Sequence, residues 1–216
     1  MAVLLGFSRL FAFFGQIRSV NSPRRAWLAA AALVWLSSLA GPALAQTSPR
    51  VKFVTTEGSF VVEVYPDKAP KTVENFLQYV KEKHYDGTVF HRVIDNFMVQ
   101  GGGFDANYVQ KATRAPVVHE GREALAKGGP KNVVGTLAMA RTNDPNSASS
   151  QFFINVKDND FLNPTPNAYG YTVFGKVVSG MEVVNKIKSV PTGAGGPFPS
   201  DVPKTPVIIK SASLVN

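Results

Sequence analysis

The chain has 216 residues and a formal net charge of +8, from 23 lysines and arginines against 15 aspartates and glutamates. It contains no cysteine, which excludes disulfides, thiol chemistry and cysteine metal sites. The basic residues are scattered along the chain, which excludes the clustered basic face that nucleic-acid binding needs.

The first 45 residues predict a cleavable export signal rather than part of the fold. They carry four arginines and no acidic residue, followed by an apolar run from Ala26 to Ala40 and the helix-breaking pair Gly41-Pro42. Ala43-Leu44-Ala45 then has the small-x-small pattern of a signal-peptidase site. We expect cleavage after Ala45, an exported domain over residues 46–216 and a periplasmic location.

Two consequences follow for this exported domain. Its charge falls to +4, with 19 basic residues against 15 acidic ones. It also keeps no stable membrane anchor. The alternative is a retained transmembrane helix, but the apolar run is shorter than the roughly 20 residues that a span needs.

The exported part predicts many short strands and two helices. Val, Phe and Thr-rich runs predict a hairpin over 51–56 and 59–64, joined at Glu57-Gly58. The spacing of Val73, Phe76, Leu77 and Val80 predicts an amphipathic helix that begins at Ala69-Pro70 and ends near 81–83. Further strands are predicted at 88–94, 98–100, 135–140, 151–156, 171–178 and 207–215, and a second helix at 180–188.

Gly- and polar-rich stretches at 104–132, 141–150, 158–170 and 189–206 are predicted as loops. The two helices are too few for alternating β-α-β units, so the fold class is mainly β, an eight-stranded antiparallel barrel with helices covering its ends.

The segment 88–104, TVFHRVIDNFMVQGGGF, sets the fixed cation of Arg92 among large apolar side chains. A buried unpaired charge is costly, so we expect a substrate to use the N–H donors of Arg92.

The histidines are not expected to carry chemistry. His91 alternates to the face opposite Arg92 and is expected to be packed and hydrogen-bonded. None of the three histidines, His84, His91 and His119, has a ligand partner at metal-site spacing, and no metal is expected. Neither a nucleotide-binding glycine motif nor a G-x-S-x-G elbow is present.

Four ordered motifs give the chain a family resemblance. FHRVIDNFMVQGG at 90–102, LAMA at 137–140, SQFFI at 150–154 and VFGKVVSGMEVV at 173–184 resemble the cyclophilins, which are peptidyl-prolyl cis-trans isomerases. The similarity spans 51–215 and is greatest to the bacterial periplasmic members.

The resemblance implies a closed eight-stranded antiparallel β-barrel capped by two α-helices, with a proline pocket on its outer surface. It implies rotation about Xaa-Pro bonds that assists the folding of exported proteins, with no cofactor. Its implied partners are proline-containing unfolded or flexible polypeptides, and the enzyme is expected to be a monomer.

The resemblance also implies roles for individual residues. Arg92 matches the catalytic arginine. The proline-pocket wall matches Phe97, Met98, Phe153 and Leu162, and the peptide-holding groups match Gln100, Gln151 and the backbone at Ala140 and Arg141. The chain departs from the familiar eukaryotic pattern at three binding positions, with Phe161 for a tryptophan, Tyr171 for a histidine and Arg141 for an asparagine.

Three other interpretations of the residues remain open. Arg92 could brace the barrel through a carboxylate, with the aromatic residues as plain core. The domain could be a proline-peptide binding module or holdase in which catalysis is incidental. It could also be a hollow barrel for a small ligand, of the lipocalin type.

Overall fold

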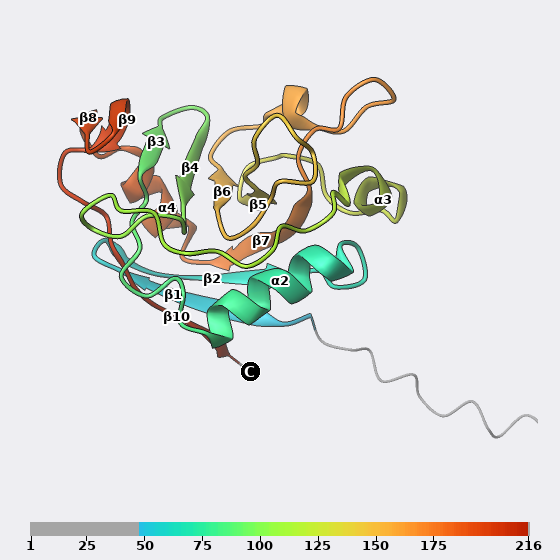
Figure 1. Cartoon of the computed structure of the whole chain (residues 1–216), viewed down its shortest axis with the longest axis horizontal. Helices are drawn as coiled ribbons and strands as arrows, with labels where there is room; N and C mark the ends of the chain where they lie inside the picture. The colour runs from blue at the N-terminus through green and yellow to red at the C-terminus, as the bar shows by residue number, and fades with distance from the viewer. Residues whose placement is uncertain (1–47, 216) are drawn as a thin grey trace, which may run out of the picture. The chain divides into compact units, whose positions relative to one another are not determined.

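The computed structural model describes residues 48–215, and this part is organised around one curled eight-stranded antiparallel sheet (Figure 1). The strand order is β10-β1-β2-β7-β5-β6-β4-β3. The strands are β1 (Arg50–Thr55), β2 (Gly58–Val64), β3 (Arg92–Ile94), β4 (Met98–Gly101), β5 (Thr136–Met139), β6 (Phe152–Asn155), β7 (Val173–Ser179) and β10 (Ile209–Val215).

The predicted export signal lies outside the described residues. Between residues 48 and 215, no helix has both the length and the apolar character needed to cross a membrane.

The β1–β2 hairpin forms where the sequence predicts it and supplies much of the core. Phe53 and Phe60 face each other in register, and their rings stack at 5.1 Å between centroids. Phe76, Tyr85 and Phe152 all have ring centroids within 6.3 Å of Phe53. These fully buried aromatic rings fill the space inside the curled sheet. A hollow barrel for a small ligand is therefore the wrong interpretation.

Between residues 48 and 215 three α-helices accompany the sheet, where the sequence predicted two. The predicted pair is present as α2 (Pro70–Lys81) and α4 (Met181–Lys188). The third, α3 (Gly121–Ala126), falls in a segment predicted as irregular loop. At six residues it is too short to show a repeating apolar stripe, which is the signal that identified the other two.

A distant carboxylate caps the first turn of α2. The N-cap residue Ala69 has no side-chain hydrogen bond to offer. Glu120 instead accepts hydrogen bonds from the main-chain N–H of Lys71 at 3.2 Å and of Thr72 at 2.8 Å, and from the Thr72 hydroxyl at 2.7 Å. This buried acid therefore satisfies helix N–H groups that have no partner within the helix.

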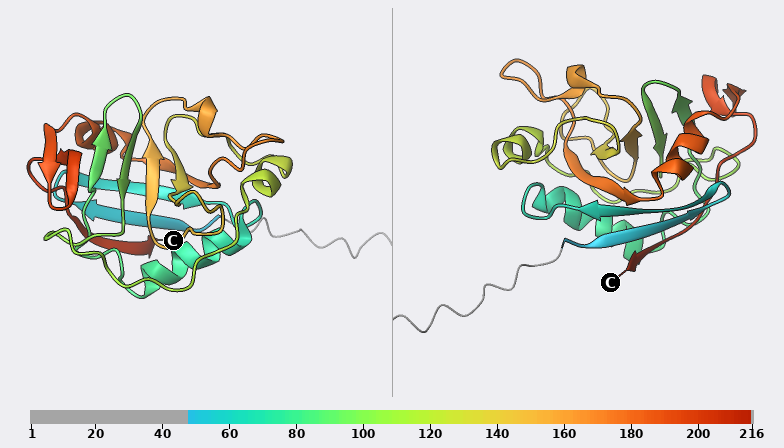
Figure 2. Two further views of the ribbon diagram at one scale, coloured as in Figure 1. Left: turned by 45° about the horizontal axis from the view of Figure 1, so that its top comes forward. Right: turned by 180° about the vertical axis from the view of Figure 1, so that it is seen from behind.

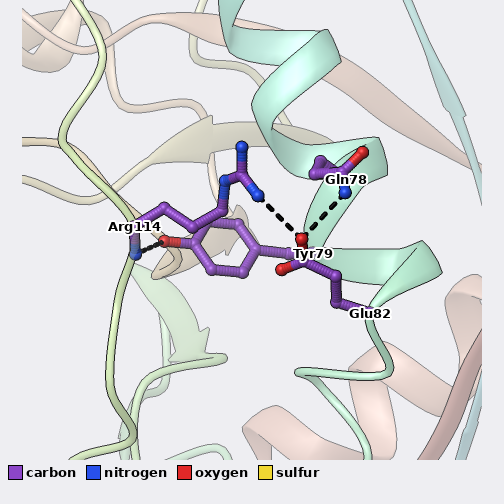
Figure 3. A network of polar contacts seen from close by, with 4 residues as sticks. All are labelled: Gln78, Tyr79, Glu82 and Arg114. Atoms are coloured by element: carbon purple, nitrogen blue, oxygen red, sulfur yellow. Dashed lines mark hydrogen bonds and ion pairs between the residues drawn. The ribbon is translucent and has the colours of Figure 1, made fainter.

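A polar network joins the other end of α2 to the segment that precedes α3 (Figure 3). The main-chain N–H of Arg114 donates to the Tyr79 hydroxyl at 2.8 Å, and its guanidinium pairs with Glu82 at 2.7 Å. Gln78 donates to the same carboxylate at 2.8 Å, and these partners lower the pKa of Glu82, with the Gln78 hydrogen bond as the largest cause. The network fixes the long 104–120 connection against the helix.

The expected closed barrel is not confirmed. β3 and β10 are the two edges of the sheet, and the two further views show it curled around the core (Figure 2). One isolated bridge, Val89 to Ile208, joins the segments that precede these edges. The strand predicted at 88–94 is reduced to three residues, so too little of it remains to pair with β10 along its length.

A second, two-stranded sheet lies where the sequence predicted only loop. β8 (Thr192–Gly195) and β9 (Phe198–Pro203) pair as a hairpin, which is seen beside β3 in Figures 1 and 2. The sequence did not predict this hairpin because it is rich in glycine and proline, at Gly193, Gly195, Pro199 and Pro203, and both residue types are depleted in ordinary strands.

Candidate functional site

The strands β4, β5 and β6 are apolar on both faces. Side chains on a strand alternate between faces, so Phe152 and Ile154 of β6 join the main core while Phe153 points the other way. Phe153 belongs to a second buried cluster with Met98 of β4 and Ala138 of β5. The sheet thus carries a second apolar centre on its outer surface.

This outer cluster forms one wall of a cavity of about 350 Å³. The sequence-predicted site residues that line the cavity are Arg92, Phe97, Met98, Gln100, Ala140, Arg141, Gln151, Phe153, Leu162 and Tyr171. Five of them belong to β3, β4, β6 and the 3-10 helix at 160–162, and the other five lie in the segments between the elements.

A left-handed residue lets two consecutive side chains reach the same cavity. Strict alternation would send Phe97 and Met98 to opposite faces. Asn96, with φ of 61°, turns the chain just before β4 begins at Met98. Phe97 therefore lies outside the alternating part of the strand, and both side chains line the cavity.

Arg92 presents an exposed guanidinium at this cavity. Among residues 48–215 it has no ion pair and no side-chain hydrogen bond, and it stands directly across from Gln100 in the β3–β4 pairing. The expectation of a cation buried in apolar surroundings is therefore wrong. A carboxylate brace is excluded in the described part of the chain, and the N–H donors face the cavity ready to bind.

Gln100 and Gln151 form the polar side of the cavity. The Gln100 side-chain amide donates to the Gln151 side-chain oxygen at 3.0 Å, which leaves the Gln151 amide group to donate elsewhere. Gly103 makes room for this pair, because a Cβ atom there would lie 2.5 Å from the Gln151 side chain. The glycine run after β4 is therefore explained in part by close packing.

Arg141 uses its donors within the protein. Its Nε and Nη2 donate to the Gly170 carbonyl at 3.0 and 2.8 Å, and its Nη1 donates to the Thr142 carbonyl at 2.7 Å. Its guanidinium carbon lies 4.7 Å from the centre of the Tyr171 ring. The side chain thus ties the loop before Tyr171 to the cavity rim.

Phe161 differs from the other predicted residues because it does not line the cavity. Its side chain is 75% exposed and stacks on Phe97, with 5.7 Å between ring centroids. It lies in the 3-10 helix η1 (Asp160–Leu162), whose last residue Leu162 does line the cavity. Phe161 therefore lies outside the cavity and contacts it only through the Phe97 ring.

Buried asparagines hold this wall in place, and sequence reasoning missed them. Asn159 donates to the Phe97 carbonyl at 2.9 Å and to the Asn155 side-chain oxygen at 2.8 Å. Asn155 donates to Asn132 at 3.2 Å, and Asn132 donates to the Leu162 carbonyl at 3.2 Å. The three side chains therefore link the backbones of the two wall residues. Asn132 and Asn159 lie between strands, where polar residues are typical of surface loops, and Asn155 ends β6, so the burial of the three could not be inferred from residue type.

The sequence analysis also did not predict the residues on a third side of the cavity. His91, Phe104 and Phe198 line it, the last from the unpredicted β8–β9 hairpin. His91 is packed as expected, at 3% exposed, but its Nδ1 has no hydrogen-bond partner among the described residues. Burial lowers the pKa of His91 to about 4, and the positive charge of Arg92 acts in the same direction.

Comparisons with known proteins point to one family. The family model described as cyclophilin type peptidyl-prolyl cis-trans isomerase matches residues 50–214. The chain is 54% identical to peptidyl-prolyl cis-trans isomerase cyp18 of Streptomyces antibioticus, over 76% of this chain and 98% of that protein. It is 53% identical to peptidyl-prolyl cis-trans isomerase B of Escherichia coli, over the same shares of the two chains.

A solved structure has the same fold. It is a cyclophilin type peptidyl-prolyl cis-trans isomerase of Cryptosporidium parvum, determined in the presence of the dipeptide Ala-Pro. It is 26% identical, superposes with a TM-score of 0.61, and covers 77% of this chain and 99% of its own.

Proposed function

Because this chain belongs to the cyclophilin-type peptidyl-prolyl cis-trans isomerases, we propose that it rotates Xaa-Pro peptide bonds in the cavity beside Arg92. The enzyme class and its proline-containing peptide substrates follow from the family. The site and the roles of its residues are the proposal.

The reaction needs only a lower barrier to rotation. Resonance gives the peptide C–N bond partial double character and a barrier of about 18 to 20 kcal/mol. For Xaa-Pro both isomers are populated, so neither end state has to be stabilised over the other. As the bond twists, conjugation is lost and the prolyl nitrogen regains a lone pair. A donor aimed at this nitrogen binds the twisted state better than either planar state.

Arg92 is the donor that the geometry offers. It stays protonated and holds several N–H groups in a rigid fork. A hydrogen bond from a charged donor contributes roughly 1.5 to 3 kcal/mol, which is about one to two decades in rate. The rest of the acceleration is assigned to the apolar surroundings, which strengthen the dipoles within the site.

The apolar wall holds the proline ring while the preceding carbonyl swings. Met98, Phe153 and Leu162 are each less than a tenth exposed, and Phe97 closes the same wall. The Gln151 amide and the backbone at Ala140 and Arg141 hold the main chain before the proline. One end of the substrate is thus fixed and the other rotates, with no covalent intermediate or cofactor in the proposed mechanism.

The observation that carries the proposal is the guanidinium of Arg92, which lies beside an apolar pocket and has no ion pair or side-chain hydrogen bond within residues 48–215. Magnetisation exchange by NMR on an Ala-Pro peptide tests it. Arg92→Ala should slow exchange by about two decades, by analogy with the loss of one transition-state donor, while the domain stays folded. An unchanged exchange rate would place catalysis elsewhere.

Export to the periplasm, where the enzyme assists the folding of exported proteins, is the second part of the proposal. It is supported by the arginine-containing, apolar first 45 residues, which precede the family match beginning at residue 50. We propose cleavage after Ala45 and a monomeric domain over 46–216. Cell fractionation with N-terminal sequencing tests the cleavage, and light scattering tests the monomer; a cytoplasmic, uncleaved chain would contradict the export proposal.

A further inference from the structure

The β8–β9 hairpin contributes one large side chain to the substrate cavity. Phe198 is the first residue of β9 and lines the cavity with His91 and Phe104. The hairpin stands beside β3, at the edge of the sheet that carries Arg92 (Figure 2). None of the residues in the proposed mechanism comes from this hairpin.

Three rings form one packed unit on this side. The Phe198 ring lies 5.3 Å from the His91 ring at an interplanar angle of 29°, and 5.1 Å from the Phe104 ring at 88°. His91 and Phe104 are themselves 4.7 Å apart. Phe198 and Phe104 stay half-buried, so apolar ring surface remains open to the cavity.

The hairpin is anchored well enough to hold this ring in place. Val202 of β9 is 1% exposed, and Gly195 packs so closely on it that a Cβ there would lie 2.8 Å from the Val202 side chain. Gly196 at the turn approaches the Tyr108 side chain equally closely, at 2.6 Å from a would-be Cβ. Phe198 follows directly after these contacts and is therefore pre-positioned rather than free to swing.

The order of the strands indicates which part of the substrate meets Phe198. Across the site the sheet runs β5, β6, β4, β3, with β9 beyond β3. The groups proposed to hold the residue before proline, at Ala140 and Arg141, follow β5. The proline wall is carried by β6 and β4. A chain that crosses the site in this direction reaches β3 and then Phe198 with the residue after proline.

We propose that Phe198 is a specificity-determining residue, whose ring contacts an apolar or aromatic side chain immediately after the proline of the substrate. This inference rests on the proposed placement of the substrate beside Arg92. It assigns the enzyme a preference for Xaa-Pro-Phe or Xaa-Pro-Leu over Xaa-Pro-Gly. The contact exists in both planar and twisted states, so it acts on substrate binding rather than on the chemical step.

The test uses exchange NMR on three peptides: Ala-Ala-Pro-Phe, Ala-Ala-Pro-Gly and Ala-Phe-Pro-Gly. In Phe198→Ala, kcat/KM for the first should fall by about fivefold to tenfold through a higher KM, as expected for the loss of one aromatic contact. The other two peptides should change less than twofold. Phe198→Tyr should retain the preference, and Leu214→Ala, an exposed change on β10, should leave all three peptides unaffected.

Two results would overturn the inference. One is an equal loss for all three peptides, which would make Phe198 a purely structural residue. The other is a loss confined to Ala-Phe-Pro-Gly, which would place the ring against the residue before proline. Failure of the site proposal gives a different result, because Arg92→Ala would then leave every peptide's rate unchanged.

Discussion

Asn159 donates its side-chain amide to the main-chain carbonyl of Phe97 at 2.9 Å, across 62 positions of sequence. The same amide group also donates to Asn155, and Asn159 is 2% exposed. The turn that aims Phe97 at the cavity is thereby fixed from behind by a residue that does not line the cavity.

Asn159→Ala should weaken both the fold and the site. It leaves the buried Asn155 side-chain oxygen without a donor, which costs about 1 to 3 kcal/mol. It also removes one of the two hydrogen bonds to the Phe97 carbonyl, which keeps the Val156 N–H at 3.1 Å, and this loss adds about 1 kcal/mol. Urea unfolding should show a loss of roughly 2 to 4 kcal/mol, and the KM for an Ala-Pro peptide should rise several-fold as the Phe97 wall loosens. Asn107→Ala, at an exposed position, is the control. A less stable variant with an unchanged KM would limit Asn159 to a structural role.

Gly103→Ala should impair peptide binding with little effect on the fold. A Cβ at this position lies 2.5 to 2.7 Å from atoms of the Gln151 side chain, so this side chain must move and its bond to Gln100 breaks. We expect peptide affinity, measured by NMR titration, to fall by about fivefold to tenfold, which corresponds to one hydrogen bond. Gly193→Ala, whose nearest neighbour atom is 3.6 Å away, is the matched control. Equal affinities in the two variants would argue against a peptide-holding role for Gln151.

Glu120→Gln should lower stability without changing the chemistry. The substitution keeps the size of the side chain. It replaces the carboxylate, whose two oxygens accept three hydrogen bonds at the start of α2, by a neutral amide with one accepting oxygen. The free energy of unfolding should fall by about 2 kcal/mol. Exchange rates per folded molecule should stay the same. The exposed Glu74→Gln in the same helix should cost almost nothing, and an equal loss in both variants would contradict the capping role.

His91 should make the enzyme less stable in mild acid. Its pKa is about 4 in the folded protein and about 6.5 in the unfolded chain, so between these two pH values the unfolded chain binds more protons. Stability therefore rises with pH through this window and is lost as pH falls from about 6.5 toward 4. The full effect is roughly 3 kcal/mol.

The variant His91→Phe isolates this contribution, because it keeps a ring between Phe104 and Phe198 but cannot titrate. Burial also lowers the pKa of His84 and His119, so some dependence with the same sign should remain. The difference in unfolding free energy between variant and wild type, followed from pH 7 to pH 4.5, measures the His91 share. A constant difference would contradict the lowered pKa.

The sequence predicts those parts of the fold that repeat locally. The alternation around Phe53 and Phe60 and the helical spacing of Val73 and Phe76 each occur within a few residues, so the hairpin and α2 could be found. The small helix α3 gives no such repeat. Closure of the sheet depends on how far two distant strands extend, which composition does not encode.

The site also has residues that a local sequence pattern reveals and residues that only the tertiary structure brings into place. Arg92, Phe97, Met98 and Gln100 lie in one short segment, and a motif can reveal them together. Phe198 reaches the cavity only because a Gly- and Pro-rich hairpin folds back beside β3. The exposure of Arg92 is also a tertiary property, since its sequence neighbours are buried while its own side chain leaves the sheet.

The two faces of β4, β5 and β6 have different roles: one packs in the core and stabilises the fold, and the other forms the substrate wall and sets selectivity. Phe152 and Phe153 are adjacent in the chain, yet one belongs to the core and the other to the substrate wall. Single substitutions at alternate positions can therefore reshape the pocket without touching the interior. A deletion of one residue in β6 would instead exchange the two roles all along the strand. Within these strands, new substrate preferences can therefore arise by substitution of single residues but not by insertion or deletion of residues.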